Sequence, residues 1–259
     1  PATIQPWLEG AVPLGKGTDP AALKDSEKKD IAEEHLLDWL LSQHDTHGDN
    51  LMRLPDGTIV GIDKEQGFKY FMGDFKKDGE IIPPDTKLSL DYHPNAAYDE
   101  TEEYYNKFWR SFADGKMDFD PKAMLGAIER IEGIKDTDYV KLLSKYTSVA
   151  PFKDDPTKLL AFVQGALDRK KNLRSDFEGF IGGLYEKRTK QQGKFTFDGG
   201  WVEAGAVPPP APKPKPKPKQ KGIALKPLSP VAKGALGVTG VELFTPAGYV
   251  APAAPPPPP

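Results

Sequence analysis

The residue types that could do chemistry gather in one stretch, residues 44–68, with the sequence HDTHGDNLMRLPDGTIVGIDKEQGF. Asp45 and Asn50 are five residues apart, and Asp63 follows Asn50 by thirteen. Carboxylate and amide oxygens are ligands that Mg²⁺ prefers. Phosphoryl transfer of the kinase type needs one Asp for the acceptor hydroxyl, and an Asn and a second Asp for the metal. The spacing fits that division, with Asp45 at the acceptor and Asn50 and Asp63 at Mg²⁺.

Residues 51–62 predict a β-hairpin that would bring the two proposed metal ligands together. Pro55-Asp56-Gly57 supplies the turn, where Gly57 can take a positive φ. The apolar strand positions are Leu51, Leu54, Ile59, Val60 and Ile62. Such a hairpin returns Asp63 to the neighbourhood of Asn50, so the two side chains can share a cation while Asp45 accepts a proton.

The order D-x-H-x-x-N, hairpin, I-D-x-x-x-G-F resembles the catalytic and metal-binding loops of the atypical protein-kinase-like fold. The pattern is most similar to the branch of HipA-type kinases and phosphatidylinositol 3-/4-kinases. The resemblance implies that Asp45 is the catalytic Asp, that Asn50 and Asp63 are metal ligands, and that His47 holds the loop's geometry. It also implies Mg²⁺ and ATP as cofactors. It covers mainly residues 3–70.

The resemblance extends to the N-terminal segment, residues 2–8, which we expect to be an extended hinge strand between two lobes. Gln5 and Trp7 would then face the adenine, although an ordinary edge strand explains the segment equally well. The sequence departs from the family in two respects. Lys-Glu-Gln separates Asp63 from Gly67, and no Gly-rich loop or strand lysine precedes the hinge. We therefore expect a kinase C-lobe whose N-lobe is an upstream segment, belongs to another chain, or never existed.

Other interpretations of the HDTHGD stretch stay open. His44 and His47 with Asp45 or Asp49 would make a zinc cluster, and a solvated polar turn would do no chemistry. At the level of the whole protein, the main expectation is Mg·ATP-dependent transfer of a phosphoryl group to a protein or lipid hydroxyl. The alternative is a catalytically inactive kinase-like module, for example in a phage particle or a toxin-delivery assembly.

The fold class that the patterns predict is α+β, mostly α. Residues 26–42 form an amphipathic helix with Ile31, His35, Leu36, Trp39 and Leu40 on the buried face. The opposite face should carry the charged residues Lys28, Lys29, Glu33, Glu34 and Asp38. His35 should be a packed core residue. Further helices are expected at 100–113, 121–132, 136–146 and 157–191, with Asp120-Pro121 and Asp155-Pro156 as starts.

Composition divides the chain into a body at 1–203 and a Pro/Lys-rich extended tail at 204–259. The body carries 28 Lys+Arg against 37 Asp+Glu, and the tail seven Lys against one Glu. An acidic body argues against nucleic acid as the main ligand. Alternating Pro and Lys favours a polyproline II spacer, so we expect the tail to link the body to a larger protein assembly.

The expected location is cytoplasmic or virion-associated. The sequence has no cysteine, which fits a reducing compartment. It opens without a signal peptide, and no apolar run approaches the length of a transmembrane helix.

Overall fold

The computed structural model describes residues 8–15, 17–68, 71–72, 76–77, 80–81, 88, 104–148, 150 and 152–205. This part of the chain is mixed α+β and mostly helical, which confirms the coarse fold class. The proposed hinge strand lies outside the described residues except for Leu8, and Gln5 and Trp7 lie outside them altogether. The tail beyond residue 205 also lies outside them.

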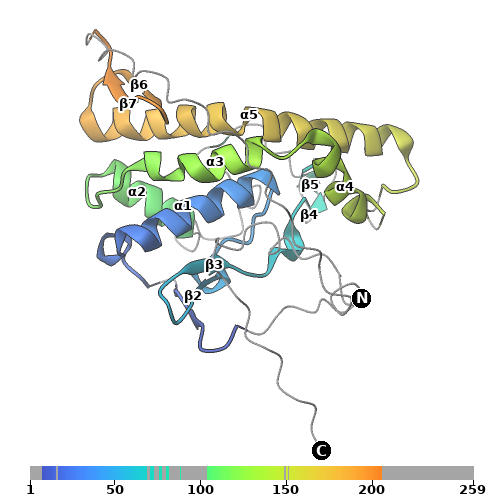
Figure 1. Cartoon of the computed structure of the whole chain (residues 1–259), viewed down its shortest axis with the longest axis horizontal. Coiled ribbons are helices and arrows are strands. Elements are labelled where there is room, and N and C mark those ends of the chain that lie inside the picture. Colours follow the sequence, from blue (N-terminus) through green and yellow to red (C-terminus); the bar gives the residue numbers. More distant parts are fainter. Residues whose placement is uncertain are drawn as a thin grey trace, which may run out of the picture. The chain divides into compact units, whose positions relative to one another are not determined.

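The helices follow the predicted segments closely. They are α1 (Asp25–Leu40), α2 (Tyr104–Ala113), α3 (Leu125–Glu132), α4 (Asp136–Thr147) and α5 (Pro156–Thr189). The long helix α5 packs against the other four (Figure 1). None of the helices in the described ranges is both long enough and apolar enough to cross a membrane.

The strands are short and antiparallel. β1 (Val12–Pro13), β2 (Leu51–Arg53) and β3 (Ile59–Gly61) form one sheet in that order, and β3 packs against α1. β4 (Lys76–Lys77) pairs with β5 (Glu80–Ile81), and β6 (Gly193–Thr196) pairs with β7 (Gly200–Glu203). The predicted hairpin between residues 51 and 62 is confirmed.

Aspartates followed by proline start three helical segments. The side chain of Asp155 accepts hydrogen bonds from the backbone N–H groups of Thr157 and Lys158 at the start of α5. Asp120 caps a 3₁₀ turn that leads into α3, and Asp19 caps another before α1. Such caps satisfy N–H groups that have no partner inside the helix.

Aromatic side chains from several helices fill the core beneath α5. His35 is 1% exposed, stacks on Tyr105 with 4.5 Å between ring centroids, and accepts a hydrogen bond from Trp109 Nε1. Its prediction as a packed core residue is confirmed. Phe177 and Phe180 of α5 meet its ring edge to face.

The charged face predicted for α1 is only partly exposed. Asp38 is 1% exposed and Lys28 is 7% exposed, so the charged residues do not all lie on a face opposite the buried one, as was expected. Asp38 is covered because Tyr105 and Lys64 bind its two carboxylate oxygens. Lys28 Nζ donates to the backbone carbonyl of Asp118. Helix α1 therefore packs on both of its faces.

The β6–β7 hairpin follows α5 and was not expected. Its signal is the alternation of Phe195 and Phe197, both 1% exposed, before an Asp-Gly-Gly turn. The hairpin packs on α5 at Gly182, where a Cβ would come within 4.0 Å of Phe195. Gly182 thus faces the hairpin, whereas a Cβ at Gly183 would meet nothing within 4 Å, and helix α5 runs through both without a break.

Candidate active site

The β2–β3 hairpin returns the chain to Asn50, one of the two candidate metal ligands. Leu51 pairs with Gly61, and the backbone N–H of Ile62 donates to the carbonyl of Asn50 at 2.8 Å. Gly57 occupies the turn with φ +89°, a conformation that favours glycine. Asp63 directly follows Ile62, whose backbone is hydrogen-bonded to that of Asn50.

The Asn50 side chain ties the candidate catalytic loop to itself. Asn50 is 8% exposed and is the last residue of the 3₁₀ helix η2 (Gly48–Asn50), directly before β2. Its Nδ2 donates to the backbone carbonyl of Asp45 at 2.9 Å. Within the described chain no donor binds Asn50 Oδ1, so this oxygen can act as a ligand.

The carboxylate of Asp45 is held by two side chains. His47 Nδ1 accepts from the backbone N–H of Asp49 at 3.2 Å, so in the neutral ring the proton is on Nε2. His47 Nε2 lies 3.3 Å from Asp45 Oδ1, and Gln66 Nε2 donates to Asp45 Oδ2 at 3.2 Å. The Asp45 side chain is 21% exposed, which leaves it open to a substrate.

The candidate metal loop has an unusual backbone. Asp63 adopts the left-handed conformation, with φ 53° and ψ 55°, directly before the 3₁₀ helix η3 (Lys64–Gln66). Its carbonyl accepts from Gln43 Nε2 at 2.7 Å. Its carboxylate makes no hydrogen bond or ion pair within the described ranges. Residues in this region are uncommon outside glycine and gather at functional sites.

Lys64 fastens this loop to helix α1. Its ammonium lies 2.6 Å from Asp38 Oδ1 and 3.2 Å from Glu34 Oε2. Gly61 leaves the space for this arrangement, because a Cβ there would overlap Lys64 Nζ and Glu34 Oε2. The position of Asp63 is thus set by the residue that follows it.

Phe68 closes the segment against the core. Its φ is 63°, and its backbone N–H donates to the carbonyl of Leu41 at 2.6 Å. Its ring meets Phe71 and Phe162 edge to face. Together with Lys64, this anchor fixes both ends of the loop that contains Gln66.

The predicted site residues therefore divide into two groups. The structure places Asp45, His47, Asn50 and Asp63 in two loops that are joined through the hairpin and through Gln66. Gln5 and Trp7 lie outside the described residues. Sequence reasoning missed Gln66, Lys64 and Gln43, which hold the two loops. The signal in the sequence was the Lys-Glu-Gln insertion before Gly67, which departs from the family pattern and contains both Lys64 and Gln66.

The zinc interpretation of HDTHGD gains no support from the geometry. Within the described ranges, no group of three or more His, Cys, Asp or Glu side chains is placed to hold a metal ion. His44 is 5% exposed, and its Nε2 lies 3.4 Å from Ser42 Oγ. A site made from Asn50 and Asp63 has only two protein ligands, and Mg²⁺ commonly keeps several waters.

Comparisons with models of protein families, with curated proteins and with solved structures found no match for this chain.

Proposed function

We propose that the body is the C-lobe of a kinase-like enzyme that transfers the γ-phosphoryl group of Mg·ATP to a hydroxyl. The observation that carries the proposal is the hydrogen bond from Asn50 Nδ2 to the carbonyl of Asp45. This bond turns the amide so that Oδ1 serves as the ligand atom. One loop thereby holds a potential metal ligand and a carboxylate in a fixed relation.

Each residue has a defined role in this proposal. Asp45 orients or deprotonates the acceptor hydroxyl, and His47 keeps its carboxylate in place. Asn50 Oδ1 and the Asp63 carboxylate fit Mg²⁺, because both are oxygen donors without a protein partner in the described ranges. Bound Mg²⁺ would neutralise phosphate charge. Gln5 and Trp7 are the proposed adenine contacts.

The tail has a separate role in the proposal. Residues 204–259 link the kinase-like body to a larger assembly, since Pro-Lys repeats form spacers rather than cores. The N-lobe comes from an upstream segment or from a partner. The phosphate acceptor is a protein or a lipid hydroxyl, as in the families that the loops resemble.

The test is a phosphoryl-transfer assay on the full-length gene product with ATP labelled at the γ-phosphate. Asp45→Asn should lower transfer by about 10²–10⁴-fold, the usual value of a positioned general base. Asp49→Asn is the matched control, because it makes the same change of charge in the same loop at an exposed residue. Equal rates for wild type and Asp45→Asn would contradict the proposal.

A structural module is the second candidate, and one observation favours it. Both carboxylate oxygens of Asp45 already contact protein side chains, His47 and Gln66, as they would in a purely structural turn. The two candidates differ in apo stability. In an enzyme, Asp45→Asn should change the free energy of unfolding by less than about 1 kcal/mol, because the Asn retains one acceptor oxygen. A larger loss without any loss of transfer would favour the structural module.

A further inference from the structure

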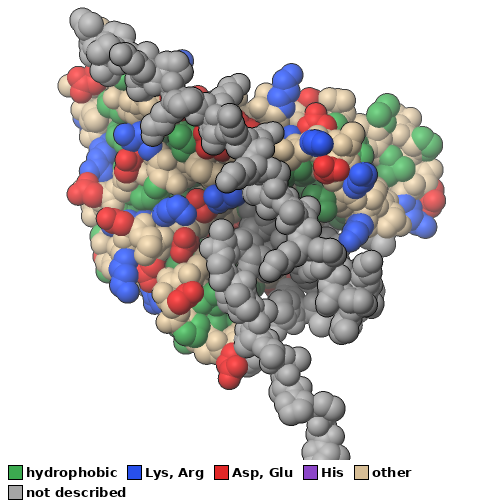
Figure 2. Space-filling view, viewed as in Figure 1, with side chains coloured by type: hydrophobic (Ala, Val, Ile, Leu, Met, Phe, Trp, Pro, Cys, Tyr) green, Lys and Arg blue, Asp and Glu red, His purple; other side chains and the backbone are tan. Residues whose placement is uncertain are grey.

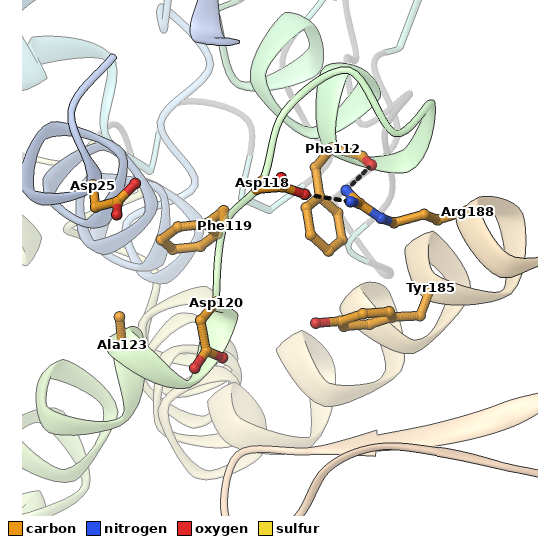
Figure 3. Close-up of a pocket in the computed structure, with 8 residues that line it drawn as sticks. All are labelled: Asp25, Phe112, Asp118, Phe119, Asp120, Ala123, Tyr185 and Arg188. Carbon is orange, nitrogen blue, oxygen red and sulfur yellow. Dashed lines mark hydrogen bonds and ion pairs between the residues drawn. The ribbon is translucent and has the colours of Figure 1, made fainter. Parts of the chain in front are cut away.

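A second recess lies away from the candidate active site, between the start of α1, the end of α2, the segment before α3 and the end of α5. It is a cavity of about 440 Å³. Figure 3 shows its lining side chains, which come from these four parts of the fold. The lining residues are Asp25, Phe112, Asp118, Phe119, Asp120, Ala123, Tyr185 and Arg188.

The rim of this recess is acidic and exposed. The side chains of Asp25 and Asp118 are each 95% exposed, and that of Asp120 is 64% exposed. Arg188 is the cation in the lining, and it is occupied. Its guanidinium donates to the carbonyl of Phe112 and to Asp118 Oδ1 (Figure 3). It also donates to the carbonyl of Met117.

The basic neighbours of the rim leave carboxylate oxygens unused. Lys28 binds Asp25 through Oδ1, and Arg188 binds Asp118 through Oδ1. Within the described ranges, Oδ2 of each of these two aspartates has no partner. Burial raises the pKa of the Tyr185 hydroxyl, and the charge of Asp120 adds to this effect more than Arg188 opposes it.

The wall of the recess is aromatic, and it contacts β7, the last strand of the described chain. Phe119 and Tyr185 are both partly exposed. The Tyr185 ring stacks on Trp201 of β7, with 5.3 Å between centroids. The described residues end at Gly205, four residues after Trp201, and the Pro-Lys segment begins at Pro208. The segment therefore follows, in the sequence, a strand that contacts the Tyr185 wall.

We propose that residues 208–217 of the same chain dock in this recess. Their sequence, PPPAPKPKPK, contains prolines that suit the aromatic wall and lysines that suit the acidic rim. Polyproline II segments bind grooves lined by aromatic side chains, because their preformed shape costs little entropy. Lys213, Lys215 and Lys217 would meet the carboxylates of the rim, and prolines would lie against Phe119 and Tyr185.

The chain is long enough to make this contact. Lys213 is eight residues beyond Gly205, and eight residues of polyproline II span about 25 Å. Because the segment is attached to the body, its effective concentration is in the millimolar range, so a weak site is enough to hold it. Charge adds to this, since the body is acidic and the tail basic. The proposal does not depend on kinase activity.

The test uses the full chain with one spin label. The sequence has no cysteine, so Ala211→Cys gives a single attachment point. Amide NMR signals of Phe119, Ala123 and Tyr185 should lose most of their intensity in the labelled protein. Raising the salt concentration from about 0.05 M to about 0.5 M should restore much of it, because exposed charges are then screened.

A matched pair of double variants tests the role of the rim. Asp25→Asn with Asp118→Asn removes two charges from the recess and keeps an acceptor oxygen at each position. Asp138→Asn with Asp154→Asn removes two exposed charges near α4, at the other end of α5 from β6 and β7 (Figure 1). The first pair should abolish most of the signal loss, and the second should leave it unchanged.

Three results would overturn the proposal. The first is signal loss that is absent or spread evenly over the body. The second is an equal effect of the two double variants. The third comes from a mixture in which labelled ¹⁴N protein is added to unlabelled ¹⁵N protein. Loss at the recess in that mixture, at the level seen within one chain, would show that the segment docks on another copy.

Discussion

Lys64 Nζ lies 2.6 Å from Asp38 Oδ1, and this ion pair joins the candidate metal loop to helix α1. Both side chains are largely buried, with 12% and 2% exposed. Burial alone would lower the pKa of the Lys64 ammonium, but the carboxylates of Asp38 and Glu34 outweigh it and raise the pKa. The lysine therefore stays charged, and it fixes the backbone immediately after Asp63.

Removing this cation should destabilise the protein strongly. Lys64→Met keeps most of the side-chain volume but leaves Asp38 without its counterion, and breaking one side of a buried pair costs about 3–5 kcal/mol. Urea unfolding of the full chain measures the loss. Adding Asp38→Asn to Lys64→Met should recover part of it, because an amide needs no counterion and can still accept from Tyr105. A loss below about 1 kcal/mol for the single variant would show that the pair does not hold the loop.

Asp63→Gly should separate stability from metal binding. Asp63 holds a left-handed conformation, its carboxylate has no partner within the described ranges, and glycine adopts this conformation without steric cost. The variant should therefore be as stable as wild type, or up to about 1 kcal/mol more stable. Urea unfolding without metal gives the comparison. A marked loss of stability would mean that the Asp63 side chain supports the fold.

Glu27 should make stability depend on acid pH. Burial acts to raise its pKa, but the Lys24 N–H and the Arg53 guanidinium, 2.7 Å from Oε1, outweigh this and lower it below 4.5. A lowered pKa means that the unfolded state binds the proton more tightly. The contribution of the Glu27 carboxylate to the free energy of unfolding is thus present above about pH 4.5, and it is lost as the pH falls through the pKa of the folded state.

Glu27→Gln is the variant that isolates this contribution. Urea unfolding at about pH 6 and about pH 3 should show a smaller pH-dependent loss for the variant than for wild type. The difference arises because Gln cannot titrate, while other carboxyl groups are unchanged. Identical pH dependences would show that the Arg53 pair, which ties β2 to α1, adds no stability.

Local patterns in the sequence predicted much of the fold. The periodic apolar residues of α1 and α5, and the Pro-Asp-Gly turn between residues 51 and 62, specify elements through neighbours in the chain. Asp38 could not be placed in this way. Its burial depends on Tyr105 and Lys64, which are 67 and 26 residues away along the chain. Helical spacing does not reveal such distant partners.

The candidate site shows the same division. The motif located Asp45, Asn50 and Asp63. The hairpin that connects Asn50 to Asp63 follows from the residues of its turn. The support from Gln43 and Gln66 did not follow from any motif, because an amide side chain carries no pattern until its partner is known. The β6–β7 hairpin is a different case. Its alternating phenylalanines and its Gly-Gly turn are local signals, so this hairpin could have been predicted from the sequence.

The most direct test of the central claim is metal binding by NMR, with Mn²⁺ in place of Mg²⁺ and a non-hydrolysable ATP analogue. The paramagnetic ion should broaden the amide signals of Asn50 and Lys64, on either side of the hairpin. Asp63→Asn should weaken binding by about tenfold or more, because a charged ligand is lost. Asp49→Asn should leave it unchanged. Broadening that misses both loops, or equal affinities for the two variants, would contradict the assignment of Asn50 and Asp63 as the metal ligands.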